Sequence, residues 1–126
     1  IGVDDPEVSA QKTRPTHDPM PLLKTQDPAR FAIVLDHRPA LRPESVGLFD
    51  LQLSGHTHGG QIHLPGYTEE FLPPYGENYI KGLFEFQNHR STSLYVNPGL
   101  GTTKIPLRFL STPEITYITL KNTTQL

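Results

Sequence analysis

Residues 49–61 decide the fold; they read FDLQLSGHTHGGQ. The first six residues alternate between apolar and polar side chains, which is the two-residue period of a β-strand. The strand runs directly into a segment that holds three glycines together with His56 and His58. Glycine lets the backbone adopt a positive φ and approach a ligand closely. The stretch therefore predicts a strand that ends in a ligand-binding loop.

A second strand is predicted at residues 31–35, where the continuous apolar run FAIVL is typical of a strand buried on both faces. His37 follows this strand as His56 and His58 follow the other. The carboxyl ends of strands in open α/β sheets converge on ligand sites. Neutral imidazole is the commonest protein ligand for metals such as zinc, manganese or iron. We therefore predict a metal site made by His37, His56 and His58, whereas the histidines at 17, 63 and 89 lack this setting and those at 17 and 89 are expected on the surface.

The rest of the pattern predicts an α+β fold, predominantly β-sheet with few short helices. Residues 1–30 are proline-rich and largely loop, and residues 31–120 form the sheet core with the metal-site loops, so that 1–126 is part of one domain. The further elements expected are the end of a strand at 1–3, a helical turn near 22–24, a short helix at about 43–46, a hairpin of 79–86 and 92–96 turning near Asn88, and a final strand at 114–120.

Composition excludes several functional classes. The chain has 126 residues, no cysteine and a net charge of −2, and 35% of its residues are hydrophobic. Without cysteine there is no disulfide framework, thiolate zinc site, Fe–S cluster or cysteine nucleophile. Without a basic stripe, a nucleic-acid-binding surface is not expected. The apolar runs are too short for a transmembrane span or a signal peptide, so we expect a cytoplasmic or membrane-peripheral location.

Several motifs together resemble one enzyme family. The block SGHTHGGQ at 54–61 is similar to the last metal motif, Gly-His-x-His, of the calcineurin-like metallophosphoesterases, in the form of a bacterial branch. IVLDHRP at 33–39 resembles the preceding motif, a strand ending in His-x-Pro. The tail, LYVNPGLGT at 94–102, PLRF at 106–109 and PEI at 113–115, is similar to that branch as well. The resemblance covers nearly the whole chain.

This resemblance implies a hydrolase that acts on phosphate mono- or diesters through two divalent metal ions, of manganese, iron or zinc. Such a pair clamps the phosphate and activates the attacking group for in-line displacement. The family pattern assigns His58 to the first metal, and His37 and His56 to the second. It also suggests Arg108 for substrate binding, because a guanidinium forks onto phosphate oxygens, although a structural role is equally expected. The implied fold is a four-layer α/β/β/α sandwich.

The family's earlier motifs, Asp-x-His, Gly-Asp and Gly-Asn-His, are absent from these 126 residues. The catalytic histidine motif is among them, so no catalytic residue is assigned. The chain is therefore interpreted as the C-terminal half of the domain, inactive alone and holding at most one weakly bound ion. It would need its N-terminal half or self-associate through an apolar face carrying Phe31, Ile33, Leu35, Leu51, Leu53 and Val96.

Two alternatives stay open at this point. One is a non-catalytic truncated or interaction module that keeps the fold without the reaction. The other, a different His-x-His enzyme such as a metallo-β-lactamase or an amidohydrolase, fits the pattern less well. The first of these usually has an Asp soon after its histidine pair, and the second places its pair near the start of a long barrel.

Overall fold

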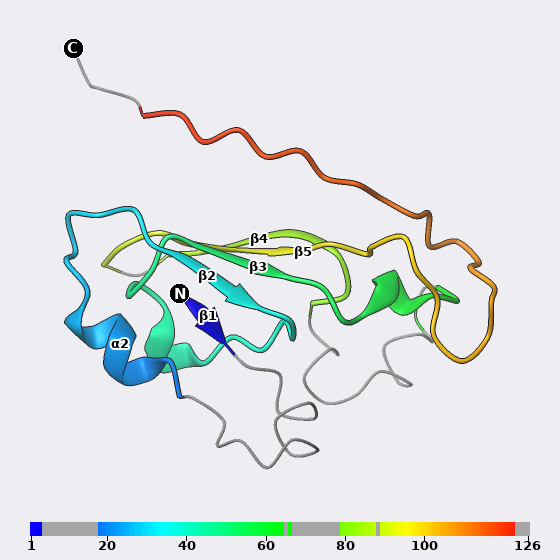
Figure 1. Cartoon of the computed structure of the whole chain (residues 1–126), viewed down its shortest axis with the longest axis horizontal. Coiled ribbons are helices and arrows are strands. Elements are labelled where there is room, and N and C mark those ends of the chain that lie inside the picture. Colours follow the sequence, from blue (N-terminus) through cyan, green and yellow to red (C-terminus); the bar gives the residue numbers. More distant parts are fainter. Residues whose placement is uncertain (4–17, 65, 67–78, 88, 123–126) are drawn as a thin grey trace.

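A computed structural model describes residues 1–3, 18–64, 66, 79–87 and 89–122 (Figure 1). The described part is built on one mixed sheet with few short helices. Its five strands lie in the order β1-β2-β3-β5-β4. Their bounds are β1 Gly2–Val3, β2 Ile33–Asp36, β3 Leu51–Ser54, β4 Gly82–Phe86 and β5 Thr92–Val96.

Strands β1, β2, β3 and β5 run parallel to one another, and β4 pairs antiparallel with β5. Parallel pairing places the carboxyl ends of β2, β3 and β5 at one edge of the sheet. The predicted hairpin is thus confirmed, while its turn near Asn88 lies outside the described residues. The predicted strands at 1–3, 31–35 and 49–54 are present in shortened form.

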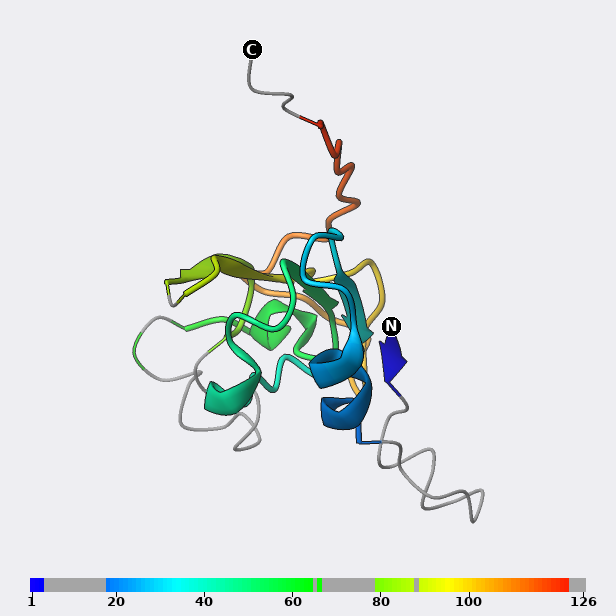
Figure 2. The same cartoon turned by 90° about the vertical axis from the view of Figure 1, so that its left-hand side faces the viewer.

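The first two helical elements lie on one face of the sheet near the amino ends of the strands, and the third lies beyond the carboxyl ends (Figures 1 and 2). The α-helix α2 spans Met20–Thr25, and two 3-10 turns follow, η1 at Pro43–Ser45 and η2 at His58–Gly60. The core beneath the sheet is small and joins the helix to the strands; its buried members are Met20, Leu23, Val34 and Phe49. The short helices predicted near residues 22–24 and 43–46 are confirmed.

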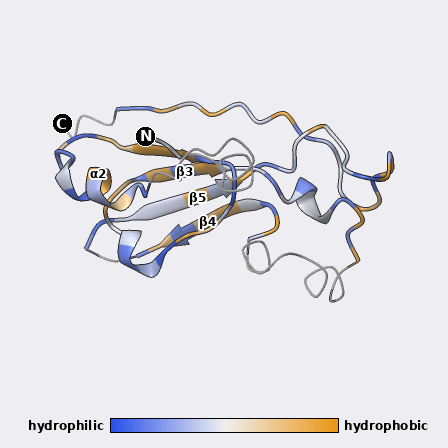
Figure 3. Cartoon of the chain, turned by 60° about the horizontal axis from the view of Figure 1, so that its bottom comes forward, coloured by the Kyte–Doolittle hydropathy of each residue, from blue (hydrophilic) through white to orange (hydrophobic). Residues whose placement is uncertain are grey.

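The two faces of the sheet differ in burial. Strand register aligns Val34, Gln52 and Leu94 on the covered face, where each is at most 3% exposed. The next row, Leu35, Leu53, Tyr95 and Leu83, points to the opposite side because side chains alternate along a strand. We call this row the open face. Figure 3 shows the hydrophobic character of β3, which contributes to it.

The burial pattern corrects two sequence predictions. Leu35 is 54% exposed, so β2 is not buried on both faces; among the described residues no element covers that side of Leu35. Val96 lies opposite Gly82 and Ser54, one residue beyond the row that holds Leu53 and Tyr95. Its side chain therefore points to the covered face, where it is completely buried. It therefore does not belong to the apolar face predicted with Leu35 and Leu53.

The strand predicted at residues 114–120 is wrong. This segment alternates like a strand, but no described segment pairs with its backbone as a β-strand. It runs away from the sheet, with Ile115 82% and Tyr117 91% exposed (Figures 1 and 2). Alternation reports the preference for extended backbone, whereas a strand also needs a neighbouring edge to supply hydrogen bonds.

None of the helices in the described ranges is long and apolar enough to span a bilayer.

Candidate metal site at the carboxyl ends of the strands

His37 and His56 meet at one edge of the sheet. His37 follows β2 and His56 follows β3, and these strands are parallel neighbours. The amide of Gly55 donates a 3.0 Å hydrogen bond to the carbonyl of His37, which ties the two loops together. The imidazole centroids are 5.0 Å apart, with the rings nearly perpendicular at 81°. The histidines of the two sequence motifs are therefore in direct contact.

A buried polar network supports the loop that carries His37. Gln52 and Ser54 are 3% and 7% exposed. The Gln52 amide donates to Ser54 Oγ at 3.0 Å, and the Ser54 hydroxyl and the Gln52 amide both donate to the carbonyl of Arg38, at 3.3 and 3.4 Å. These polar side chains face the covered side of the sheet, where they hydrogen-bond to each other and to the carbonyl of the residue after His37.

The loop after β3 has an unusual backbone. His56, His58, Gly59, Gly60 and Gln61 all have positive φ, between 50° and 79°. This region is unfavourable for residues with a Cβ, by roughly 1–2 kcal/mol each. Strained backbone of this kind concentrates at functional sites, where surrounding structure holds it in place.

Thr57 anchors this loop from within. It is 7% exposed, its hydroxyl donates to the carbonyl of Ile80 at 2.5 Å, and it accepts from the amide of Gly59 at 3.2 Å. The side chain thus caps η2 and links it to Ile80, two residues before β4. This arrangement fixes the turn between the two histidines.

His58 is not part of the His37–His56 contact as the structure describes it. Its Nδ1 lies 3.2 Å from the carbonyl oxygen of Gly101, on the segment after β5. Across the described ranges, no three His, Asp or Glu side chains are grouped to hold one metal ion. Of the three predicted ligands, the structure therefore brings two together and places the third in a separate hydrogen-bonded setting.

Arg108 lies against the histidine loop from the segment 98–111. Its guanidinium donates to the carbonyls of His58 at 3.0 Å, Pro98 at 2.8 Å and Gly101 at 2.6 and 3.0 Å. Weaker contacts of 3.3 Å reach the carbonyl and hydroxyl of Ser111. Substrate binding by Arg108 stays a prediction, and in this structure all three of its nitrogens donate to oxygens of the chain itself.

The same segment encloses the rest of the loop. Gln61 accepts from the amide of Thr103 at 2.6 Å and donates to the carbonyls of Thr103 and Ile105 at 3.0 Å. A Cβ at Gly59 would lie 2.5 Å from Ser111 Oγ and 2.9 Å from Pro98 Cβ, so only glycine fits there. The residues that make these contacts are 39 or more positions apart in the sequence, so no local sequence signal reveals the contacts.

A second polar cluster begins the C-terminal segment. Tyr95 donates to Glu114, and Thr116 Oγ1 lies 2.6 Å from the Tyr95 hydroxyl and accepts from Asn97 at 2.7 Å. Burial, followed by the hydrogen bond to Glu114, raises the pKa of Tyr95. Hydrogen bonds from Thr116 and Tyr95 lower the pKa of Glu114. The side chain of Asn97 also accepts from the amide of Gly99 at 2.6 Å.

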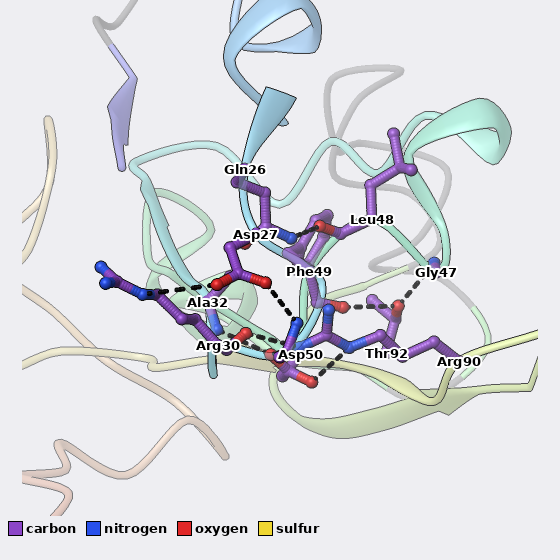
Figure 4. Close-up of polar contacts among 11 residues, drawn as sticks. Gln26, Asp27, Arg30, Ala32, Gly47, Leu48, Phe49, Asp50, Arg90 and Thr92 are labelled. Atoms are coloured by element: carbon purple, nitrogen blue, oxygen red, sulfur yellow. Dashed lines mark hydrogen bonds and ion pairs between the residues drawn. The ribbon is translucent and has the colours of Figure 1, made fainter. Parts of the chain in front are cut away.

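The opposite edge of the sheet holds an ion pair that sequence analysis missed. Arg90 donates from Nε to Asp50 Oδ1 at 2.7 Å and from a terminal nitrogen to Oδ2, and it also reaches the carbonyl of Arg30 at 2.8 Å. The amide of Ala32 donates to the same carboxylate at 2.6 Å (Figure 4). Below it, the fully buried Thr92 bridges the backbone of Gly47 and Phe49.

The remaining histidines lie apart from the site. His89 is exposed, as expected, and His17 is outside the described residues. His63 is half-buried, and its Nδ1 has no hydrogen-bond partner in the described part of the chain.

Comparison with curated proteins gives consistent names. The chain is 53% identical over 95 residues to YkuE, an uncharacterized metallophosphoesterase of Bacillus subtilis, which covers 74% of this chain and 32% of that protein. It is 35% identical over 120 residues to an uncharacterized metallophosphoesterase of Aquifex aeolicus, and the match covers 95% of this chain and 44% of that protein. It is 36% identical over 92 residues to the phosphodiesterase YaeI of Escherichia coli, and the match covers 70% of this chain and 32% of that protein. The chain thus spans less than half the length of these relatives.

No protein-family profile matches the chain, and no solved structure does. The relatives nevertheless agree with one another, because two of the three are named metallophosphoesterase and the third phosphodiesterase. These relatives support the metallophosphoesterase family for the part of the chain that they share.

Proposed function

We propose that this chain is the C-terminal portion of a metal-dependent phosphoesterase that hydrolyses phosphate mono- or diesters. The observation that supports it most is the contact of His37 with His56 at the carboxyl edge of parallel strands. Two imidazoles that bind one zinc ion at about 2.0–2.1 Å, with a near-tetrahedral angle between them, have ring centroids roughly 5 Å apart. The observed separation of 5.0 Å fits that requirement.

In the proposed centre, His37 and His56 bind one divalent ion and His58 contributes to a second. A pair of such ions neutralises the phosphate and activates water for in-line attack. Carboxylate ligands for this centre are not grouped with these histidines in the described ranges. We propose that they come from the region that the relatives carry outside the aligned part, as the second half of a four-layer sandwich.

The open face supports the same division. Leu35 and Leu83, at the two ends of the row that also holds Leu53 and Tyr95, are 54% and 59% exposed. Contiguous apolar surface of this kind marks an interaction site. The proposed partner is the N-terminal half of the domain, or else a second copy of the chain. A non-catalytic interaction module, the second candidate function, would use the same surface without the reaction.

A chimera tests the proposal. The part of YkuE that precedes the aligned region would be fused to this chain and supplied with manganese. We expect turnover of bis(p-nitrophenyl) phosphate by the chimera, loss of turnover with His56→Ala, and none by this chain alone. An inactive but folded chimera would favour the interaction module. Turnover by the chain alone that His56→Ala abolishes would contradict the divided centre while preserving the phosphoesterase activity.

A further inference from the structure

The ring of His58 makes a hydrogen bond that selects between its two neutral tautomers. Its Nδ1 faces the carbonyl oxygen of Gly101 at 3.2 Å. A carbonyl can only accept, so in the neutral imidazole this contact favours the tautomer with the proton on Nδ1 and the lone pair on Nε2. A histidine that binds a metal needs this state, with one ring nitrogen held by a protein acceptor and the other left as the ligand.

The Gly101 carbonyl is itself held by Arg108. The guanidinium donates to it from both Nε, at 3.0 Å, and a terminal nitrogen, at 2.6 Å. The same side chain donates at 3.0 Å to the carbonyl of His58, which also accepts from Ser111 Oγ at 2.8 Å. Arg108 therefore contacts both the backbone of His58 and the acceptor of its ring.

The backbone of His58 needs such support. Its φ of 52° is one of five positive values between residues 56 and 61. A planar guanidinium with five donors in a fixed fork can hold several carbonyls at set angles, which a lysine ammonium cannot reproduce. Ser111, only 2% exposed, closes the same side of the loop.

We propose that Arg108 is a positioning residue: through the carbonyls of His58 and Gly101 it fixes the loop conformation and the Nδ1-protonated tautomer of His58. The role in metal binding rests on the proposed function, whereas the tautomer and the loop conformation are properties of the chain alone. This role differs from direct contact between Arg108 and a phosphate.

Nitrogen-15 NMR of the histidine side chains tests the proposal in the metal-free chain. The wild-type spectrum should show His58 as the Nδ1-protonated tautomer. Arg108→Met should average the two ring nitrogens of His58, while the amide signals of β2, β3 and β5 stay in place. Arg108→Lys should restore the signals only in part. The matched control is Arg42→Met, because Arg42 is an exposed arginine whose carboxylate partner is Asp18 at the surface.

Zinc titration by calorimetry gives the second readout. Loss of a residue that orients a metal ligand typically lowers metal affinity by about 10–100-fold. We expect a decrease of that size for Arg108→Met and none for Arg42→Met. If Arg108→Met fails to fold, Ser111→Ala removes one donor to the His58 carbonyl and should produce a smaller change of tautomer signals in the same direction.

The outcomes separate the two proposals. An Nε2-protonated His58 in the wild type, or a His58 spectrum unchanged by both Arg108→Met and Ser111→Ala, would overturn the positioning role. A tautomer change as expected, together with no zinc binding by any variant, would preserve the positioning role and count against the metal site.

Discussion

Two arginines make different kinds of contact at the two ends of the strands, Arg90 where the strands begin and Arg108 where they end. At the edge where the strands begin, Arg90 pairs with the carboxylate of Asp50, and the two side chains are 24% and 17% exposed. At the edge where they end, the described partners of Arg108 are carbonyl and hydroxyl oxygens. At the first edge, the ion pair and its hydrogen bonds to backbone groups join three segments of the chain. At the second edge, Arg108 supports a loop that carries two histidines and whose backbone has several positive φ values. One end of the sheet is thus held by an ion pair between side chains, whereas the other carries strained backbone that an arginine supports through carbonyl oxygens.

The largest effect is expected at the histidine edge, from Gly59→Ala. An alanine at this position would have to adopt the φ of +62° that Gly59 has, and its Cβ would press against Ser111 and Pro98. The strained φ and the overpacking together should lower the free energy of unfolding by about 3 kcal/mol. Gly99→Ala is the control, because Gly99 has a φ of +67° and no atom within 4 Å of the added Cβ.

Urea denaturation of both variants measures this difference. Gly99→Ala should lose only the conformational part, about 1 kcal/mol. Equal losses for the two variants would show that the loop and the segment 98–111 do not pack as closely as the structure has them.

Breaking the ion pair at the other edge should give the next largest effect. Arg90→Met leaves the carboxylate of Asp50 largely buried, with the amide of Ala32 as its remaining partner among the described residues. We expect a loss of about 2 kcal/mol in the free energy of unfolding, because an uncompensated charge then stays partly desolvated. Arg42→Met, which removes an exposed pair with Asp18, should cost less than about 0.5 kcal/mol. If Arg90→Met were as mild as Arg42→Met, the partly buried ion pair would not stabilise the fold more than an exposed one does.

A smaller effect should expose the strain at His58. Glycine tolerates positive φ, so His58→Gly should be more stable than His58→Ala by about 1 kcal/mol. Both variants lose the contact of the imidazole ring with Gly101, so the difference between their stabilities reports the cost of the positive φ. At Thr112, which lacks a positive φ, the order should reverse, with alanine the more stable. Thermal unfolding of the four variants decides this, and the same order at both positions would argue against strain in the histidine loop.

The sequence predicted the local features of this molecule well. The strand endings that carry His37 and His56 follow from hydrophobic runs that stop at polar residues. The ion pair of Asp50 with Arg90 and the contact of Arg108 with His58 join residues 40 and 50 positions apart, for which alternation carries no information. The same limit explains the error at Glu114–Leu120, where strand propensity is present and a pairing edge is not described.

The smallest effect concerns pH at the start of that C-terminal segment. The pKa of Glu114 is lowered by hydrogen bonds from Thr116 and Tyr95, so this contribution to stability is present above the ordinary Glu range, near pH 4.3, and is lost as the pH falls below it. The pKa of Tyr95 is raised, so its contribution is present below about pH 10 and is lost at higher pH.

Tyr95→Phe should therefore be slightly less stable than the wild type at neutral pH. The difference should shrink both in acid and in strong alkali, as followed by the urea midpoint. A difference that does not change with pH would mean that Tyr95 and Glu114 are not coupled in solution.

A zinc titration followed by nitrogen-15 NMR of the histidine side chains tests directly whether His37 and His56 share a metal ion, as proposed. We expect the His37 and His56 signals to shift together with one saturation curve, and His37→Ala to remove the response of His56. The exposed His89 serves as the internal reference and should not respond. Signals of His37 and His56 that stay unchanged, or that shift no more than that of His89, would contradict the claim.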